Sequence, residues 1–126
     1  MAIYDCFQYF NEDHIADLRF NILSEFVDKF IVVESTVNHQ GNPKKLHFKV
    51  DNYRKFKNKI KYIVVDDTPE NLKKPHEGGE SLVEQYQRNS ITKGLTNCHD
   101  NDLVILSDVD EIPDLSKLNR FDKKNK

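Results

Sequence analysis

Short apolar runs that end in polar residues recur along the chain. They cover residues 3–10, 30–35, 61–65 and 103–106, and each contains β-branched or aromatic residues. A short run that is apolar on every side predicts a strand buried on both faces, which is typical of a parallel sheet. The sequence therefore predicts an α/β fold built on a mostly parallel sheet.

Apolar positions at helical spacing predict two helices that flank this sheet. The first covers about residues 12–28, with Asn11 as the expected N-cap. The second runs from about residue 81 to 97, because Ser81 and Glu84 have the spacing of a capping box. A strand, a helix and a second strand joined by short links predict a βαβ unit with parallel strands.

The last apolar run ends abruptly in Ser107, Asp108, Asp110 and Glu111. In open α/β sheets, ligands bind beyond the carboxyl ends of the strands. Carboxylates packed this closely repel one another unless a cation neutralises them. Oxygen ligands two positions apart suit Mg²⁺ or Mn²⁺, with a ligand's phosphates completing the shell. We therefore expect Asp108 and Asp110 to bind a metal and a diphosphate. The alternative is an ordinary polar turn after a strand.

Two further groups of polar residues are candidates for the same site. Glu34, Ser35 and Thr36 end the second apolar run, and a parallel sheet would place them on the same rim as the carboxylates. Glu34 is predicted to contact a nucleotide or its ribose, and the alternative is a solvent-facing strand end. Arg88 lies in the helix that leads into the last strand, so we expect it to reach the carboxylates or a phosphate, with a surface ion pair as the alternative.

Composition and charge exclude several classes of protein. The chain has 126 residues, which suits one domain. Its formal net charge is −2, so no overall positive field favours nucleic acid or a membrane surface. Cys6 and Cys98 are distant in sequence and suggest neither a disulfide framework nor a zinc site. The basic stretch at 54–61 contains aromatic residues, but we expect a solvated face rather than a nucleic-acid surface.

The chain contains no predicted membrane segment. No stretch approaches about 18 consecutive apolar residues, which a membrane-spanning helix requires. The first residues lack the basic region and apolar core of a signal peptide. The default expectation is therefore a cytoplasmic protein or a fragment of a larger one.

Several motifs in a fixed order resemble glycosyltransferase family 17. The most specific is Asp102-Leu-Val-Ile-Leu-Ser-Asp-Val-Asp-Glu-Ile-Pro113, which extends the D-x-D pattern on both sides. The other matching segments are 4–7, 10–12, 30–36, Gly41, 87–91 and 94–95. The resemblance spans roughly residues 3 to 114, nearly the whole chain.

The resemblance implies a Rossmann-like fold of the GT-A type. It implies a single nucleotide-sugar-binding domain over residues 1–121, followed by a basic tail at 122–126. Members of the family usually continue well beyond the D-x-D-E-I-P motif, so the chain is expected to be the N-terminal, donor-binding portion, truncated at its C-terminus. The Golgi enzymes of the family also carry a membrane anchor.

The resemblance also implies a reaction and a set of site residues. The family transfers N-acetylglucosamine from a UDP-sugar donor to a glycan acceptor, the β-mannosyl unit of an N-glycan, with inversion and a divalent metal, Mn²⁺ or Mg²⁺. Asp108 and Asp110 match the metal-binding D-x-D. The implied donor-binding residues are Glu34, Ser35, Thr36, Arg88, Asn89, Asp108, Asp110 and Glu111. The general base that inversion requires has no candidate in the sequence.

Two other classes remain as alternatives, and the sequence argues against a third. A phosphotransferase of the haloacid-dehalogenase type also places D-x-D after an apolar strand, but that motif normally stands near the N-terminus. A non-catalytic nucleotide-sugar-binding remnant would keep the donor side and lack the acceptor side. An EF-hand loop would need a Gly in its turn and a Glu at its end, and the sequence has neither at those positions.

Overall fold

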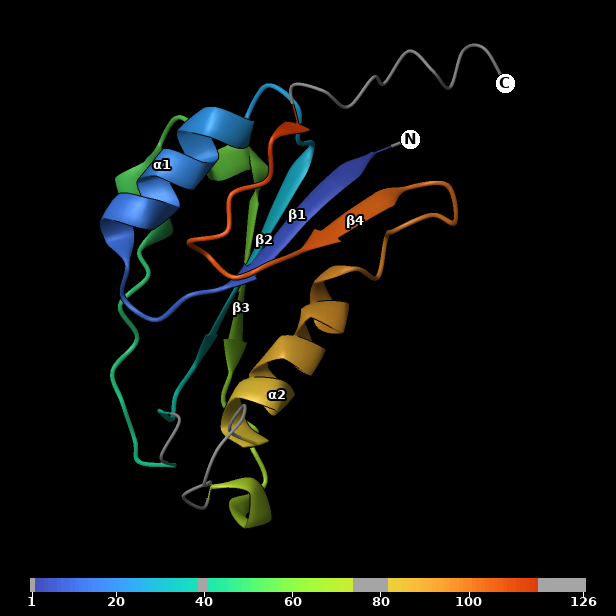
Figure 1. Ribbon diagram of the computed structural model, residues 1–126. Coiled ribbons are helices and arrows are strands. Elements are labelled where there is room, and N and C mark those ends of the chain that lie inside the picture. The colour runs from blue at the N-terminus through green and yellow to red at the C-terminus, as the bar shows by residue number, and fades with distance from the viewer. Residues whose placement is uncertain (1, 39–40, 74–81, 116–126) are drawn as a thin grey trace.

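Four parallel strands form the centre of the computed structural model, which describes residues 2–38, 41–73 and 82–115 (Figure 1). The strands are β1 (Ile3–Gln8), β2 (Lys29–Ser35), β3 (Ile60–Val65) and β4 (Leu103–Leu106). Their order across the sheet is β3-β2-β1-β4, and every neighbouring pair is parallel. The predicted α/β fold with a parallel sheet is therefore confirmed.

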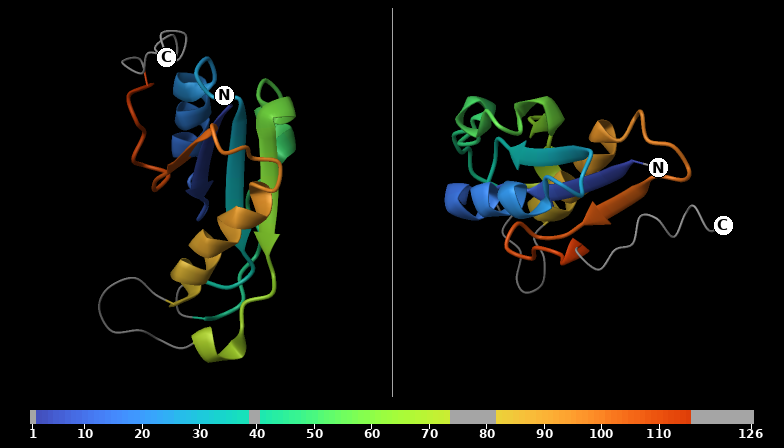
Figure 2. Two further views of the ribbon diagram at one scale, coloured as in Figure 1. Left: turned by 90° about the vertical axis from the view of Figure 1, so that its right-hand side faces the viewer. Right: turned by 90° about the horizontal axis from the view of Figure 1, so that it is seen from above.

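Helical segments cover both faces of this sheet (Figures 1 and 2). One face packs against α1 (Asp13–Leu23), the 3₁₀ segment η1 (Val50–Tyr53) and Phe56, which precedes the 3₁₀ segment η2 (Lys57–Lys59). The other face packs against α2 (Leu82–Asn89) and the 3₁₀ segment η4 (Ser90–Gly94). A further short 3₁₀ segment, η3 (Glu70–Leu72), follows β3. Because both faces are covered, the central strands need apolar side chains on both sides, as their sequences show.

Each face of the sheet has its own apolar core. On the α1 face, the Phe20 ring lies at the centre of an aromatic cluster, 4.9 Å from the ring of Phe30 and 5.1 Å from that of Tyr53. On the α2 face, Cys6 and Ile31 belong to a smaller cluster. Burial raises the pKa of the Cys6 thiol to about 12, so this cysteine behaves as an apolar core residue.

The first helix starts one residue later than predicted. Glu12, not Asn11, is the N-cap residue of α1, and its side chain makes no capping hydrogen bond. Asn11 has a φ of 81°, a left-handed conformation that asparagine tolerates better than most residues. Asn11 therefore turns the chain out of β1 before the helix begins.

The first helix also ends at Leu23 rather than near residue 28. The backbone N–H groups of Phe26 and Val27 both donate to the carbonyl oxygen of Leu23, which closes the helix in a turn. Asp28 then joins the starts of two strands, because its N–H donates to the Ile3 carbonyl and its carboxylate accepts from the Ile3 N–H. Because α1 ends at this point, β2 can begin beside β1.

The second predicted helix, 81–97, is an α-helix only as far as Asn89. It continues as the 3₁₀ segment η4, which places Ile91 and Gly94 against the sheet. Ser81, the predicted first residue of its capping box, lies outside the described residues. So does the tail at 122–126.

The strand order creates one place where the topology changes direction. The chain builds outward from β1 through β2 to β3, and then returns to add β4 on the other side of β1. Cys6 of β1 pairs with Leu106 of β4, so the carboxyl ends of these two strands lie side by side. This is the 3-2-1-4 order of Rossmann-like sheets, in which ligands bind where the order reverses.

Candidate functional site

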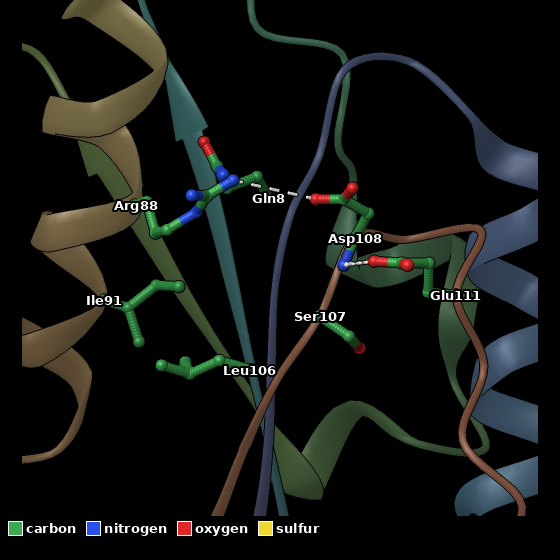
Figure 3. Close-up of a pocket in the computed structure, with 7 residues that line it drawn as sticks. All are labelled: Gln8, Arg88, Ile91, Leu106, Ser107, Asp108 and Glu111. Carbon is green, nitrogen blue, oxygen red and sulfur yellow. Dashed lines mark hydrogen bonds and ion pairs between the residues drawn. The ribbon is translucent and has the colours of Figure 1, made fainter. Parts of the chain in front are cut away.

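A cavity of about 250 Å³ lies at the carboxyl ends of β1 and β4 (Figure 3). It is lined by Gln8, Arg88, Ile91, Leu106, Ser107, Asp108 and Glu111. Gln8 ends β1, Ser107 and Asp108 follow β4, and the side chain of Arg88 approaches from α2. The predicted carboxylate segment is therefore located at the switch point of the sheet, and we call this space the Arg88 cavity.

The carboxylate segment forms a closed turn. The N–H of Glu111 donates to the Asp108 carbonyl at 2.9 Å, and the N–H of Asp108 donates to the Glu111 carboxylate at 3.2 Å. Val109 is buried between them, whereas Asp108, Asp110 and Glu111 are exposed. The backbone of this segment therefore forms a polar turn, which is the alternative that the sequence left open. Its exposed carboxylates are what a ligand can reach.

Arg88 lies beside this turn, in a contact that fits both the predicted approach to the carboxylates and its alternative, a surface ion pair. Its Nη2 atom lies 3.9 Å from Oδ1 of Asp108, and both side chains are about half exposed. An exposed ion pair at this distance contributes little to stability. The guanidinium group can therefore donate to an anion in the cavity at small energetic cost, and guanidinium is well suited to phosphate oxygens.

Arg19 holds the carboxylate turn from the core side, a contact that the sequence does not reveal. Its Nε and Nη2 atoms donate to the two carboxylate oxygens of Asp5 at 2.7 and 2.6 Å, and both side chains are fully buried. The remaining N–H groups point at the segment after β4. They donate to the Ser107 hydroxyl and to the carbonyl oxygens of Asp108, Val109 and Glu111.

The sequence gives an indication that Asp5 and Arg19 are buried, although the two residues are not neighbours in the chain. Asp5 interrupts an apolar strand, and Arg19 occupies an inward position of α1 beside Phe20. Charged residues are almost never fully buried unless they are paired, so two such residues indicate a buried ion pair. Only the fold shows that they are partners and that Arg19 also binds the turn.

A metal fits this turn only together with a ligand. Asp108 and Asp110 offer two exposed carboxylates, and Mg²⁺ is commonly bound through one or two carboxylates plus substrate phosphates and water. Within the described ranges, no group of three or more His, Cys, Asp or Glu side chains could hold a metal ion by itself. The two carboxylates therefore suit a cation that is shared with a diphosphate, and the metal remains a prediction.

A second cavity, of about 270 Å³, lies next to the same turn, and we call it the Glu12 cavity. It is lined by Gln8, Phe10, Glu12, Ile15, Glu84, Asp108, Val109 and Asp110. Burial raises the pKa of Glu12, a hydrogen bond from the Phe10 backbone opposes this shift, and the negative charges of Asp110 and Glu34 add to it. Gln8 and Asp108 belong to both cavities, so the two spaces adjoin at these side chains.

Glu34 occupies a different position from the one expected. It is fully buried, and its two carboxylate oxygens accept hydrogen bonds from the protein. The donors are Lys44 Nζ at 2.8 Å, the His47 N–H at 2.8 Å, the Phe48 N–H at 3.0 Å and the Tyr62 hydroxyl at 2.6 Å. Burial alone would raise the pKa of Glu34, but these donors outweigh it and the pKa is lowered. The geometry therefore supports a structural role that ties the 44–48 segment to β2, and it does not support the predicted nucleotide contact.

The other predicted donor-binding residues lie apart from the turn. The Ser35 hydroxyl accepts from the Val37 N–H, and the Thr36 hydroxyl donates to the Val65 carbonyl, so both are engaged at the end of β2. Asn89 is exposed at the end of α2 and lines neither of the two cavities. The structure therefore brings together Arg88, Asp108 and Glu111, with Asp110 beside them, and not the residues that end β2.

The basic stretch at 54–61 agrees with its prediction as a solvated face. Arg54, Lys55, Lys57 and Lys61 are exposed. Lys59 turns inward, where its ammonium group donates to the carbonyl oxygens of Ser24 and Val27. None of the helices in the described part of the chain has the length and apolar character needed to span a membrane.

Comparison with known proteins gives one family and several relatives. The family model for glycosyltransferase family 17 matches residues 1–123. Two proteins named beta-1,4-mannosyl-glycoprotein 4-beta-N-acetylglucosaminyltransferase, from Homo sapiens and Rattus norvegicus, are each 29% identical over 114 residues. The Mus musculus protein of that name is 28% identical over the same length. Each match covers 82% of this chain and 20% of the relative, so the chain spans about a fifth of their length. No solved structure gives a significant match.

Proposed function

The chain belongs to glycosyltransferase family 17, and from this membership we propose that its sheet provides the UDP-sugar donor site of an N-acetylglucosaminyltransferase with a GT-A type fold. One observation carries the proposal: the carboxylates of Asp108 and Asp110 stand at the carboxyl edge where the strand order reverses, with Arg88 beside them. Rossmann-like sheets bind nucleotides at this point.

In this proposal the Arg88 cavity takes the diphosphate of the donor. Arg88 supplies a cation and N–H donors on one side, and Asp108, together with Asp110 of the adjoining Glu12 cavity, would hold Mn²⁺ or Mg²⁺ on the other. When bound, such a metal neutralises the diphosphate and stabilises the departing UDP. Arg19 keeps the turn in place while both groups act.

We propose transfer with inversion to a mannosyl unit of an N-glycan. The name of the relatives describes a β-N-acetylglucosaminyl product on a mannosyl-glycoprotein. UDP-N-acetylglucosamine carries its sugar in α linkage, so a β product requires inversion at the sugar carbon. Inversion requires a general base near the acceptor hydroxyl.

Thermal unfolding with the donor tests the proposal. UDP-N-acetylglucosamine with Mn²⁺, at about 100 times its dissociation constant, should add about 2.7 kcal/mol and raise the midpoint by several degrees. The shift should require Mn²⁺ and should disappear in Asp110→Ala. Asp100→Ala is the matched control, because Asp100 is an exposed aspartate in the turn before β4, at the opposite end of that strand.

The possible results of this experiment distinguish binding of the donor from transfer of its sugar. No shift in a wild-type chain that unfolds cooperatively would contradict the donor site. A shift accompanied by transfer to a mannosyl acceptor would support the full reaction. A shift without transfer would support a donor-binding unit that lacks the acceptor side.

A further inference from the structure

Two side-chain oxygens next to the carboxylate turn have no hydrogen-bond partner. They are Oε1 of Gln8 and Oε1 of Glu12, and both atoms are buried. The Gln8 side chain is only 4% exposed, and both residues line the Glu12 cavity. A buried acceptor without a donor lowers the stability of the folded protein, so such atoms indicate positions that a ligand or water completes.

The lining of the Glu12 cavity is rich in hydrogen-bond acceptors. Its polar side chains include the carboxylates of Glu12, Glu84, Asp108 and Asp110, together with the amide of Gln8. Carboxylates accept hydrogen bonds and do not donate them when ionised. A ligand that matches this lining must therefore bring donors, either as hydroxyl groups or as a cation.

The remaining features favour sugar hydroxyl groups as the donors, beside the metal proposed at Asp108 and Asp110. Phe10 and Ile15 supply an apolar part of the lining, against which the C–H face of a sugar ring can pack. The volume of about 270 Å³ lies just below the range of about 300–1,000 Å³ that is typical of pockets for drug-sized ligands. It is therefore on the scale of a single sugar unit.

We infer that the Glu12 cavity binds the sugar of the donor, with sugar hydroxyl groups donating to Gln8 Oε1 and Glu12 Oε1. This inference rests on the proposed donor site, and it assigns different parts of the donor to the two adjoining cavities. The diphosphate lies near Arg88 and the sugar lies near Glu12, with Asp108 at the border between them.

The test replaces Gln8 by methionine, which keeps the approximate volume and removes the amide. Without ligand, Gln8→Met should unfold at the same or a higher temperature than wild type, because a buried unpaired acceptor is lost. With Mn²⁺ present, UDP should still bind the variant, and its dissociation constant is measured beside that of the sugar nucleotide because Gln8 also lines the Arg88 cavity. The ratio of the dissociation constant of UDP to that of UDP-N-acetylglucosamine should fall by about fivefold, as expected for one hydrogen bond.

Gln87 provides the matched control. It is a buried glutamine that lines neither cavity, its Nε2 atom donates to the Val33 carbonyl at 2.9 Å, and its Oε1 atom, like that of Gln8, is buried without a partner. Gln87→Met removes the hydrogen bond to Val33 as well as an unpaired acceptor, so it should unfold at a lower temperature than Gln8→Met. It should leave the ratio of the two dissociation constants unchanged. Glu12→Gln, which keeps an acceptor and removes the charge, should lower the ratio by a smaller factor than Gln8→Met.

Two results would overturn the inference, and they are distinguishable. If Gln8→Met unfolds at a lower temperature and keeps the wild-type ratio, Gln8 is a structural residue, while metal-dependent UDP binding still supports the donor site. If wild type binds neither UDP nor UDP-N-acetylglucosamine with Mn²⁺, the donor site itself is absent and the sugar site fails with it.

Discussion

At the scale of single residues, Arg19 connects the core to the carboxylate turn. Its guanidinium group lies 4.8 Å from the Phe7 ring centroid, it forms two bonds to Asp5, and it donates to carbonyl groups of the turn. Replacing a whole buried ion pair by apolar residues is often neutral or stabilising, so such a pair is weak evidence for a stabilising role. The number of bonds from Arg19 to the turn indicates that it positions Asp108.

Variants of Arg19 and Asp5 distinguish the effect of this ion pair on stability from its effect on the position of the carboxylate turn. Arg19→Met should destabilise the protein by about 3–5 kcal/mol, because it leaves Asp5 buried and unpaired. The double variant Arg19→Met/Asp5→Leu should recover much of that loss, because no buried charge remains. Its turn still lacks the Arg19 donors, so the affinity for UDP with Mn²⁺ should stay reduced. Urea unfolding and calorimetric titration measure the two quantities.

A double variant that is stable and binds UDP as tightly as wild type would contradict the positioning role. Lys57→Met serves as the control, because Lys57 is an exposed lysine paired with the exposed Asp51. Loss of the Lys57 ammonium group should change the free energy of unfolding by less than about 1 kcal/mol. It should not change UDP binding.

Glu34 gives a prediction for the dependence of stability on pH. Its pKa in the folded protein is lowered by its four hydrogen-bond donors, despite the opposing effect of burial. Its charge therefore contributes stability that is fully present above the ordinary glutamate pKa of about 4.3 and is lost as the pH falls through the folded-state value. Glu34→Gln should be less stable than wild type at pH 7, by about 1–3 kcal/mol.

Urea unfolding of both proteins between pH 7 and pH 3 measures this contribution. The difference in unfolding free energy should be constant from pH 7 to about pH 5 and should shrink below about pH 4. A difference that is the same at pH 3 and pH 7 would contradict the lowered pKa of Glu34.

At the scale of elements, the sequence predicts the strands better than the helix ends. The four strands are correctly predicted because runs such as 30–35 and 103–106 are apolar on every side, and burial on both faces requires that pattern. The end of α1 depends on the link from Asp28 to Ile3, a contact between residues that are far apart in sequence. A periodic pattern alone cannot predict such a contact.

The 3₁₀ segment η4 shows a second effect of packing on helix geometry. A Cβ atom added at Gly94 would lie 2.6 Å from the Cγ2 methyl of Ile31 on β2. Gly94→Ala should therefore destabilise the protein by about 1–3 kcal/mol through overpacking, measured as a shift of the urea midpoint. Thr92→Ala, an exposed position on the same segment, should change stability by about 0.5 kcal/mol or less. Equal effects of the two substitutions would contradict the close packing of η4 on the sheet.

At the scale of the whole molecule, strand order determines which predicted residues meet. The sequence correctly predicts polar strand ends on one rim, because a parallel sheet aligns its carboxyl ends. It does not predict that β1, rather than β2, lies beside β4. Gln8 is therefore the residue that faces the carboxylate turn, and Glu34 lies one strand farther away. Neither the role of Gln8 nor that of Glu12 could be predicted before the strand order was known.

The central claim is that Asp108 and Asp110 bind a divalent metal together with a nucleoside diphosphate at the switch point. Electron paramagnetic resonance of Mn²⁺ tests it most directly, because the signal of the free hydrated ion decreases when the ion is bound. The protein and UDP together should reduce this signal more than the sum of their separate effects. The extra reduction should be lost in Asp108→Asn/Asp110→Asn and kept in Asp100→Asn. The same extra reduction in the double variant, or none in wild type, would contradict the claim.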